Sequence, residues 1–279
     1  MSVVPVGWPE SRPLAVSVSV MLEGWAEDQA PGMGPMGNVL RPGVLDLQGR
    51  SWADYGAKVG AWRILDILAK ADLRGVFYTS GVVAEQYPAL VRAIVEAGHV
   101  VAAHGMSQGT LPPYLTELEE RADIAACRRV LTAAGGAAPG GWLSPRCTPS
   151  AATSRLLAEA GFRWHADSFD NDLPVPIVTT AGPILGMPFT MEVNDMPLYV
   201  RYGNEPEAFA RILDRIVSGW PRLGSPFGCL DITVHAHVFG RPYGALALLD
   251  ALEIARRAEW CWVTHHAALA ALDWGAAQR

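Results

Sequence analysis

The chain has 279 residues, half of them apolar, with a formal net charge of −6 and four cysteines. A chain of this length can bury a substantial core as one large α/β domain or two small ones. The acidic balance and the lack of lysine or arginine runs argue against nucleic acid or an anionic membrane as a partner. The cysteines show no Cys-x-x-Cys spacing, so they indicate neither a zinc knuckle nor a disulfide framework.

The N-terminal residues carry no sign of export. Residues 1–13 contain prolines and lack the apolar stretch of a signal peptide. No apolar run in the chain approaches the roughly 20 residues of a membrane helix. Together with cysteine usage that suits a reducing compartment, this predicts a cytoplasmic protein. We expect an N-terminal extension over 1–13 and one catalytic domain over 14–275.

Strand-like and helix-like segments alternate along the whole chain. Apolar and β-branched runs predict strands at 14–21, 76–80, 100–103, 141–145, 162–166, 229–234 and 260–263, with short extended pieces within 174–196. Helical spacing and capping residues predict helices at 55–71, 82–97, 116–134, 149–160, 205–218, 243–257 and 266–272. About seven such alternations, without a linker or an internal repeat, favour a closed (β/α) barrel over an open sheet.

One long connection, residues 26–51, interrupts this alternation. It is rich in glycine, proline and methionine, and a connection of this length is usually functional or disordered. Its apolar side chains, among them Met33 and Met36, predict an ordered and largely buried loop. We interpret it as an active-site lid or a contact between subunits, and we expect a homo-oligomer, either a dimer or a tetramer.

Polar residues recur where the predicted strands end. In a β/α barrel the C-terminal strand ends converge on one face, where the active site forms. The residues at these ends are Glu23, Ser80, His104, Arg146, Asp167, Asp170, Asn194, Asp195, His235 and His237. Carboxylates, imidazoles and one arginine, without a thiol nucleophile or a phosphate-binding loop, suit hydrolysis by general acid–base catalysis.

Several short stretches then point to a family. In chain order they are Trp52-Ala-Asp-Tyr-Gly56, Trp62-Arg63, Ser168-Phe-Asp-Asn-Asp-Leu-Pro174, Pro188-Phe-Thr190, Asn194-Asp195-Met196 and His235-x-x-x-x-Gly-Arg-Pro242. This order resembles the polysaccharide deacetylase (NodB-homology, carbohydrate esterase 4-like) superfamily from residue 14 to residue 272. It is most similar to the branch with the metal-independent allantoinase and bacterial cyclic imide hydrolases. The resemblance implies a distorted (β/α) barrel that hydrolyses C–N bonds.

The chain departs from the metal-dependent members of that superfamily at two motifs. Those members carry an Asp pair or Asp-x-Asp at the end of the first strand, where this chain has Met21 and, nearby, only Glu23. They also carry His-x-x-x-His, whereas His104 is followed four residues later by Gln108. A divalent transition metal usually needs at least three good protein ligands. We therefore expect no metal cofactor; in the alternative, Glu23, His104 and His235 hold a divalent metal such as zinc.

Three residues are the candidates for catalysis. Glu23 is expected to be the general base, because burial in an apolar mouth would raise its pKa toward neutrality. In the alternative it caps the following loop or forms a salt bridge there. His104 would orient water or stabilise the oxyanion. His235 would protonate the leaving nitrogen or fix a carboxylate, and His237 is as compatible with a supporting contact as with a catalytic one.

Further residues are candidates for substrate binding. Arg146 could hold a substrate carboxylate or carbonyl in a bidentate grip, or could pair with Asp167 or Asp170. At least one of the three aspartates Asp167, Asp170 and Asp195 would instead support Arg146 or His235. The residues expected to bind substrate are Trp142, Arg146, Asp167, Asp170, Asn194, Asp195 and His237.

The expected function is hydrolysis of a non-peptide amide or imide bond in a small, cyclic substrate, with a carboxylate activating water. One alternative is a metal-dependent N-deacetylase of an N-acetyl sugar or another N-acylated small molecule. A second alternative, from a different class, is a catalytically silent barrel that binds a ligand or a partner protein.

Overall fold

The computed structural model describes residues 8–9, 11–32, 34, 36–37, 40–41, 43–225 and 227–274. Residues 1–7 and 10 of the predicted N-terminal extension, and Met33, lie outside the described residues. Within the described part the strands form one nine-stranded sheet in the order β6-β7-β5-β4-β3-β2-β1-β8, with β9 on β1. The strands are β1 (Leu14–Leu22), β2 (Val76–Thr79), β3 (Val100–Ala103), β4 (Gly141–Trp142), β5 (Trp164–Ser168), β6 (Val175–Thr179), β7 (Gly182–Pro188), β8 (Gly228–His235) and β9 (Cys261–Thr264).

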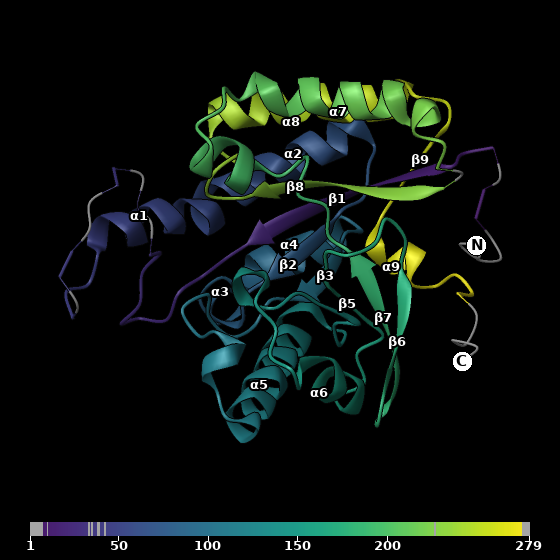
Figure 1. Ribbon diagram of the computed structural model, residues 1–279. Helices are drawn as coiled ribbons and strands as arrows, with labels where there is room; N and C mark the ends of the chain where they lie inside the picture. The colour runs from purple at the N-terminus through teal and green to yellow at the C-terminus, as the bar shows by residue number, and fades with distance from the viewer. Residues whose placement is uncertain are drawn as a thin grey trace.

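Helices surround this sheet (Figure 1). The α-helices are α1 (Leu47–Tyr55), α2 (Ala61–Ala71), α3 (Gly81–Gln86), α4 (Pro88–Glu96), α5 (Glu117–Gly135), α6 (Thr153–Glu159), α7 (Glu207–Gly219), α8 (Pro242–Arg257) and α9 (His266–Leu269). Two π-helical segments, η1 (Gly56–Gly60) and η4 (Met196–Arg201), and three 3₁₀ turns, η2 (Pro112–Tyr114), η3 (Pro145–Cys147) and η5 (Trp220–Leu223), complete the described elements. The predicted single α/β domain with a distorted barrel is confirmed, although the sheet has more strands than the seven expected.

The central strand β1 shows how the barrel is distorted. Along one edge β1 pairs with β8 over its whole length, from Leu14 opposite Gly228 to Met21 opposite His235. Its other edge is shared, because β9 pairs with the first half of β1 and β2 with the second half. At the far side of the sheet, β6 and β7 form an antiparallel hairpin. The segment after β7 joins β8 through one isolated bridge, Asn194 to Thr233, and through hydrogen bonds between Thr190 and Asp231, so the barrel is incompletely closed.

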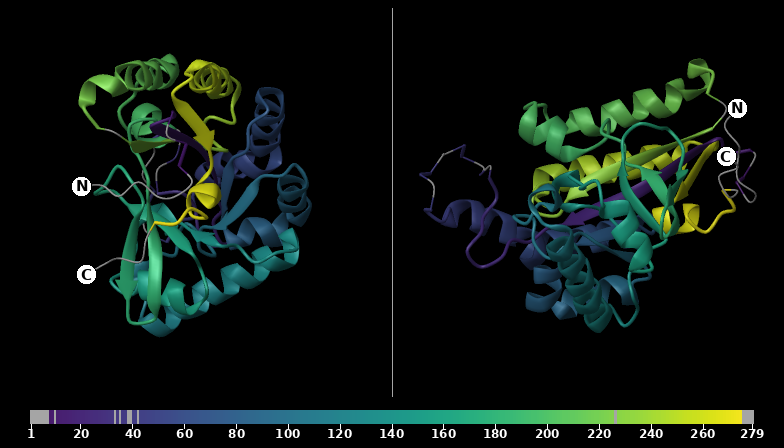
Figure 2. Two further views of the ribbon diagram at one scale, coloured as in Figure 1. Left: turned by 90° about the vertical axis from the view of Figure 1, so that its right-hand side faces the viewer. Right: turned by 60° about the horizontal axis from the view of Figure 1, so that its bottom comes forward.

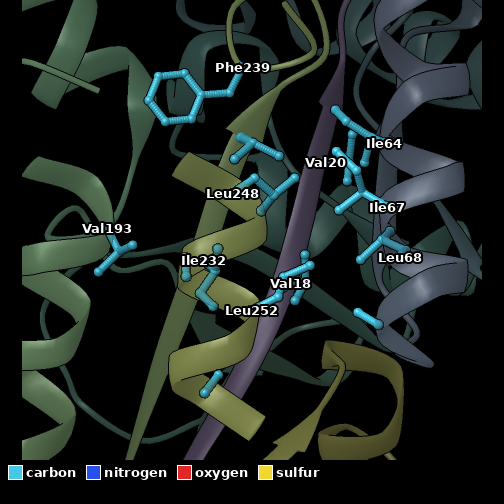
Figure 3. Packing of buried hydrophobic residues seen from close by; sticks show 14 of the residues in the cluster. Val18, Val20, Ile64, Ile67, Leu68, Val193, Ile232, Phe239, Leu248 and Leu252 are labelled. Atoms are coloured by element: carbon cyan, nitrogen blue, oxygen red, sulfur yellow. The ribbon is translucent and has the colours of Figure 1, made fainter. Parts of the chain in front are cut away.

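Alternation of side chains along β1 separates the core from the barrel interior. Val18 and Val20 point outward and pack under α2 and α8, as Figure 3 shows. Ser17 and Ser19 point the other way and make buried hydrogen bonds inside the barrel. The outer layer of α2, α7 and α8 covers β1 and β8, while α5 and α6 lie on the opposite side of the molecule (Figures 1 and 2).

An aromatic cluster occupies the N-terminal end of the barrel. The ring of Trp8 lies edge-on to Phe227, Trp262 and Trp274, with centroids 5.5–6.2 Å apart. Such edge-to-face pairs add to the stabilisation from burial alone. The functional cavity must therefore form at the opposite end, where β1, β3 and β8 finish.

The helix predicted over 55–71 begins earlier than expected. Asp46 caps α1 by accepting a hydrogen bond from Gly49 N at 2.9 Å, and η1 connects α1 to α2 without a break. A Cβ atom on Gly60 would lie 1.9 Å from the carbonyl oxygen of Ala236. Glycine is thus required for η1 to approach the loop after β8, which carries His237.

The long connection and α1 form an arm that projects from the body of the molecule (Figure 1). Within the single chain its apolar side chains are mostly exposed: Met36 by 69%, Val44 by 58% and Leu47 by 70%. The expectation that residues 26–51 are largely buried is therefore wrong for the isolated chain, because the arm extends away from the core. In the part of the chain that the structure describes, none of the helices is both long and apolar enough to cross a membrane.

Candidate active site

Glu23 directly follows β1, and three imidazole rings surround its carboxylate. Its Oε1 lies 3.6 Å from His104 Nε2 and 3.7 Å from His235 Nε2, and its Oε2 lies 3.9 Å from His237 Nε2. β1, β3 and β8 each deliver one of these groups at their C-terminal end. Groups that are far apart in the sequence therefore meet at one point of the barrel.

The imidazoles determine the protonation of Glu23. Burial raises its pKa, but attraction to His235, followed by the hydrogen-bonding and charge effects of His104 and His237, outweighs burial and lowers the pKa to about 2. The expectation that an apolar mouth would raise this pKa toward neutrality is therefore wrong. Glu23 is an ionised carboxylate at neutral pH, because its neighbours stabilise the anion.

His235 is fixed by a buried carboxylate beneath it. Its Nδ1–H donates to Asp195 Oδ1 at 2.6 Å, and its backbone N–H donates to Asp195 Oδ2 at 2.8 Å. This leaves Nε2 directed toward Glu23. Burial lowers the pKa of His235, but the charges of Asp195 and Glu23 overcome that effect and raise it, which favours the protonated ring.

His104 is oriented by a backbone group. Its ring Nδ1 lies 2.8 Å from the carbonyl oxygen of Leu143, and since a carbonyl can only accept, Nδ1 carries the hydrogen. In the neutral ring Nε2 is then an acceptor that faces Glu23, where a water molecule would donate to it.

His237 completes the ring of imidazoles in an aromatic setting. The rings of Trp52 and Trp25 stand perpendicular to it, with centroids 4.5 and 6.0 Å away. Burial lowers the pKa of His237 to about 3 despite the opposing charge of Glu23, so the ring is neutral. Its Nε2 is buried and makes no hydrogen bond to any described residue. A buried polar atom without a partner normally costs stability, and here it points at a position that a ligand could fill.

These groups lie at the base of a cavity of about 350 Å³. Besides the four residues just described, its lining includes Arg146, Asn194 and Arg201 among the polar side chains. Trp25, Trp52, Phe189, Met191 and Met196 contribute apolar walls, and Pro31 and Gly32 bring the root of the arm to the rim. The volume is near the lower end of the range for small-molecule pockets. The sequence did not single out Arg201; the only signal was a basic residue that ends the apolar run 196–200.

Gln108 lies outside this cavity and connects the loops that form it. It is fully buried, and its side-chain Nε2 donates to Ser80 Oγ at 3.1 Å and to the carbonyl oxygen of His104 at 2.9 Å. Its Oε1 accepts a hydrogen bond from Arg146 N at 3.0 Å, and its own backbone N–H donates to Gly24 O at 2.9 Å. The residue that interrupts the His-x-x-x-His motif thus links the ends of β1, β2 and β3 to the loop after β4.

Arg146 and Cys147 have an unusual backbone conformation. Their φ angles are +52° and +54°, in the left-handed region that costs a non-glycine residue about 1–2 kcal/mol. Cys147 also lines the cavity, but burial and the charges of Asp167 and Glu23 raise its pKa well above the usual range. The thiol is therefore protonated and a poor nucleophile.

Four residues expected at the substrate lie elsewhere, and one of them is Asp195, which holds His235. Trp142 is fully buried, donates from Nε1 to Ser144 Oγ at 3.1 Å and packs edge-on against Phe162. Asp167 accepts hydrogen bonds from Ser144 N at 2.9 Å and Ser144 Oγ at 2.8 Å. Asp170 is exposed in the loop after β5. None of these residues lines the cavity, because β4 turns Trp142 into the core and Ser144 holds Asp167 near the end of β5.

A second polar cluster, unexpected from the sequence, fills the barrel interior below the site. Asp231 on β8 accepts hydrogen bonds from the hydroxyls of Ser17, Ser19 and Thr233. The His266 ring lies between Ser17 Oγ at 3.1 Å and the Tyr78 hydroxyl at 2.6 Å. These side chains are buried and belong to no cavity given above, so we assign them a structural role.

The residues present do not fit a resident metal. Of the ligand positions in metal-dependent relatives, Met21 offers no oxygen, and the amide oxygen of Gln108 is used by Arg146 N. Among the residues with described positions, no group of three or more histidine, cysteine, aspartate or glutamate side chains is arranged to hold a metal ion. We therefore derive no step through a metal.

The sequence pattern of the polysaccharide deacetylase family matches residues 53–165, the part of the chain that contains His104 and Gln108. Residues 53–165 carry a polysaccharide deacetylase family domain. Solved structures extend the likeness to nearly the whole chain. The PuuE allantoinase is 27% identical with a TM-score of 0.86, over 96% of this chain and 92% of that chain.

Two further proteins support this assignment. A Pseudomonas aeruginosa PAO1 protein named as a polysaccharide deacetylase is 26% identical with a TM-score of 0.86, over 96% of this chain and 93% of that one. A Schizosaccharomyces pombe protein of the same name is 26% identical over 297 residues, covering 92% of this chain and 88% of its own. The domain and its neighbours place the chain among hydrolases of C–N bonds other than peptide bonds.

Proposed function

We propose that the chain hydrolyses the C–N bond of a small cyclic amide or imide, with water activated by Glu23 and without a metal. The observation that carries this proposal is the ionised Glu23 carboxylate facing three imidazoles at the base of a small cavity. The likeness to an allantoinase structure over nearly the whole chain supports the cyclic substrate.

The size of the cavity favours a small ring over a polymer. Its volume of about 350 Å³ corresponds to on the order of ten water molecules. That space can hold a five- or six-membered ring with its substituents. A polysaccharide would require an extended groove with several sugar subsites.

In the proposed reaction, one group of the site first accepts a proton and another then donates one. Glu23 and His104 Nε2 hold a water molecule, and Glu23 accepts its proton as the water oxygen attacks the ring carbonyl carbon. The lowered pKa makes Glu23 a weak base, but keeps it ionised and ready to accept. His235, held by Asp195, donates a proton to the leaving nitrogen as the C–N bond breaks. The product is a ring-opened amide or urea with a new carboxylic acid, which releases its proton to solvent, and the proton on Glu23 returns to His235.

The test is turnover of hydantoin, succinimide, dihydrouracil and allantoin before and after exhaustive chelation. We expect ring opening of at least one of them, unchanged by chelator, together with no acetate release from N-acetylglucosamine. Activity that is lost on chelation and restored by zinc, or acetate release alone, would overturn the proposal in favour of the metal-dependent deacetylase. Ligand binding without turnover of any compound would favour the silent barrel.

We also propose that the chain assembles into a homo-oligomer through its arm. The exposed side chains of Met36, Val44 and Leu47 form an apolar surface that a second copy could cover. Light scattering of the purified protein should give a mass of two or four chains, and Leu47→Asp should reduce it. A monomer at micromolar concentration would contradict this proposal.

A further inference from the structure

Two guanidinium groups face the same cavity as Glu23, from loops that follow different strands. Arg146 lies in η3 after β4, and Arg201 ends η4 after β7. Arginines elsewhere, such as Arg121 and Arg155, form ion pairs on the surface. Within the described part of the chain, the structure gives no carboxylate partner to either Arg146 or Arg201.

The charge of Arg201 reaches the reacting groups. The pKa of His235 is governed first by burial and by the Asp195 and Glu23 carboxylates, and the positive charge of Arg201 lowers it. Burial is the main cause that raises the pKa of Cys147, and the positive charge of Arg201 offsets part of that rise. Since Cys147 adjoins Arg146 in the chain, Arg201 acts on the side of the cavity to which Arg146 belongs.

The conformation of Arg146 is an independent observation. A left-handed backbone at an arginine persists only where the surroundings impose it, and such positions cluster at ligand sites. Here Arg146 N donates a hydrogen bond to Gln108 Oε1, which helps to hold the backbone in place. Glycine would adopt this conformation without strain. An arginine at this position despite the strain indicates that its side chain has a role.

The remaining lining offers no free acidic side chain to either arginine, and both residues are exposed to solvent. Glu23 is engaged by its three imidazoles at the base, and the walls near the rim are apolar, including Trp25 and Phe189. A neutral ring would leave both guanidinium groups unpaired in the complex. A planar carboxylate matches the guanidinium fork in geometry and in charge.

We propose that the substrate is a cyclic amide or imide that carries a carboxylate substituent, held by Arg146 and Arg201 while its ring carbonyl lies at Glu23. This inference rests on the proposed ring hydrolysis and specifies the substrate class for it. The substituent takes no part in the chemistry: the bond that breaks is the ring C–N bond, and the carboxylate leaves unchanged in the product.

The experiment compares hydantoin with hydantoin-5-acetic acid, which share a ring and differ in one carboxylate. The variants are Arg146→Gln and Arg201→Gln, with Arg211→Gln on the exposed side of α7 as the matched control. We expect the wild type to prefer the anionic ring. Each cavity variant should lower kcat/KM for that ring by about 10- to 100-fold, as for one lost charge-assisted contact. The loss should fall mainly on KM, and kcat/KM for the neutral ring should fall several-fold less than kcat/KM for the anionic ring.

Equal losses for both rings, or a wild-type preference for the neutral ring, would overturn the inference while leaving ring hydrolysis intact. Calorimetric binding to the Glu23→Gln variant separates the two proposals. If neither ring is opened but that variant binds the anionic ring more tightly, and Arg201→Gln removes the difference, the arginine subsite stands and the hydrolysis proposal fails. Equal binding of the two rings would count against the subsite.

Discussion

The same two strands, β1 and β8, build two polar layers inside the barrel, and the layers differ in how their acidic groups are satisfied. In the lower layer, Asp231 receives three hydroxyl hydrogen bonds, two of them at 2.9 and 2.7 Å. In the upper layer, Glu23 has only imidazole nitrogens at 3.6–3.9 Å, and the Nε2 of His237 makes no hydrogen bond among the described residues.

This difference separates a structural layer from a functional one. Hydrogen bonds that are complete in the folded chain leave no capacity for a ligand, and they add rigidity to the core. Donors and acceptors that are too far apart to bond each other directly can still bind a water molecule or a ligand. We therefore propose that the upper layer binds water and substrate, and that the lower layer supports the strands that carry it.

The largest expected effect is on turnover, from Glu23→Gln. The substitution keeps the shape of the side chain and removes the anion, so kcat should fall by about 10³-fold, within the range for losing a general base. The protein should remain folded, as judged by its circular dichroism spectrum and its melting temperature. A variant with near wild-type turnover would show that the upper layer is not the reacting centre.

The converse substitution, Asp231→Ala, should act on stability. It removes the carboxylate that accepts from three buried hydroxyls, so the free energy of unfolding should fall by about 3–5 kcal/mol. Urea unfolding measures this loss. Thr233→Val, which removes one donor, should cost only about 1 kcal/mol. Activity per folded molecule should stay within threefold of wild type in both variants, and a selective loss of kcat would contradict the separation of the layers.

A smaller effect is expected at Gln108, which connects the upper layer to Arg146. Gln108→Met keeps the volume but removes the bonds to Ser80, to the His104 carbonyl and to Arg146 N. We expect kcat/KM to fall by about tenfold, the equivalent of about 1.4 kcal/mol. Gln86→Met, at an exposed position of α3, is the control and should leave the kinetics unchanged. Equal kinetics for the two variants would mean that Gln108 does not position the site.

The smallest effect on turnover is expected at a histidine outside both layers, whose substitution changes the acid sensitivity of the fold. Burial lowers the pKa of His99 from 6.5 to about 4, so between these values the unfolded chain binds a proton that the folded chain does not. Stability should therefore decrease as the pH falls from 6.5 to 4. His99→Gln should reduce that slope in urea titrations at pH 7 and pH 4.5, with little change in turnover at pH 7. An unchanged slope would contradict the assignment.

The sequence was sufficient to locate the upper layer but not the lower one. Apolar runs predict where strands end, so Glu23, His104 and His235 could be placed on one face of the barrel. The polar alternation of Ser17 and Ser19 in the first strand was available as a signal for the lower layer. Its meaning depends on Asp231, whose direction follows only from the register between β1 and β8.

The remaining expectations failed where the direction of a side chain could not be predicted from the sequence. Trp142 ends β4 and Asp167 lies near the end of β5, yet Trp142 points into the core and Asp167 is held by Ser144. A sequence places a residue near a strand end without showing which way it turns. Adjacent histidines illustrate this as well: His265 caps α9, while its neighbour His266 lies in the lower layer.

Because of the left-handed backbone at Arg146, thermal stability and substrate recognition favour different residues at this position. Glycine there would relieve the conformational strain, so a selection that rewards only resistance to heat would accept Arg146→Gly. The selected protein would keep its fold and lose a guanidinium at its cavity. Engineering for stability near this loop therefore needs a parallel screen on substrate preference, since melting temperature alone would reward the wrong variant.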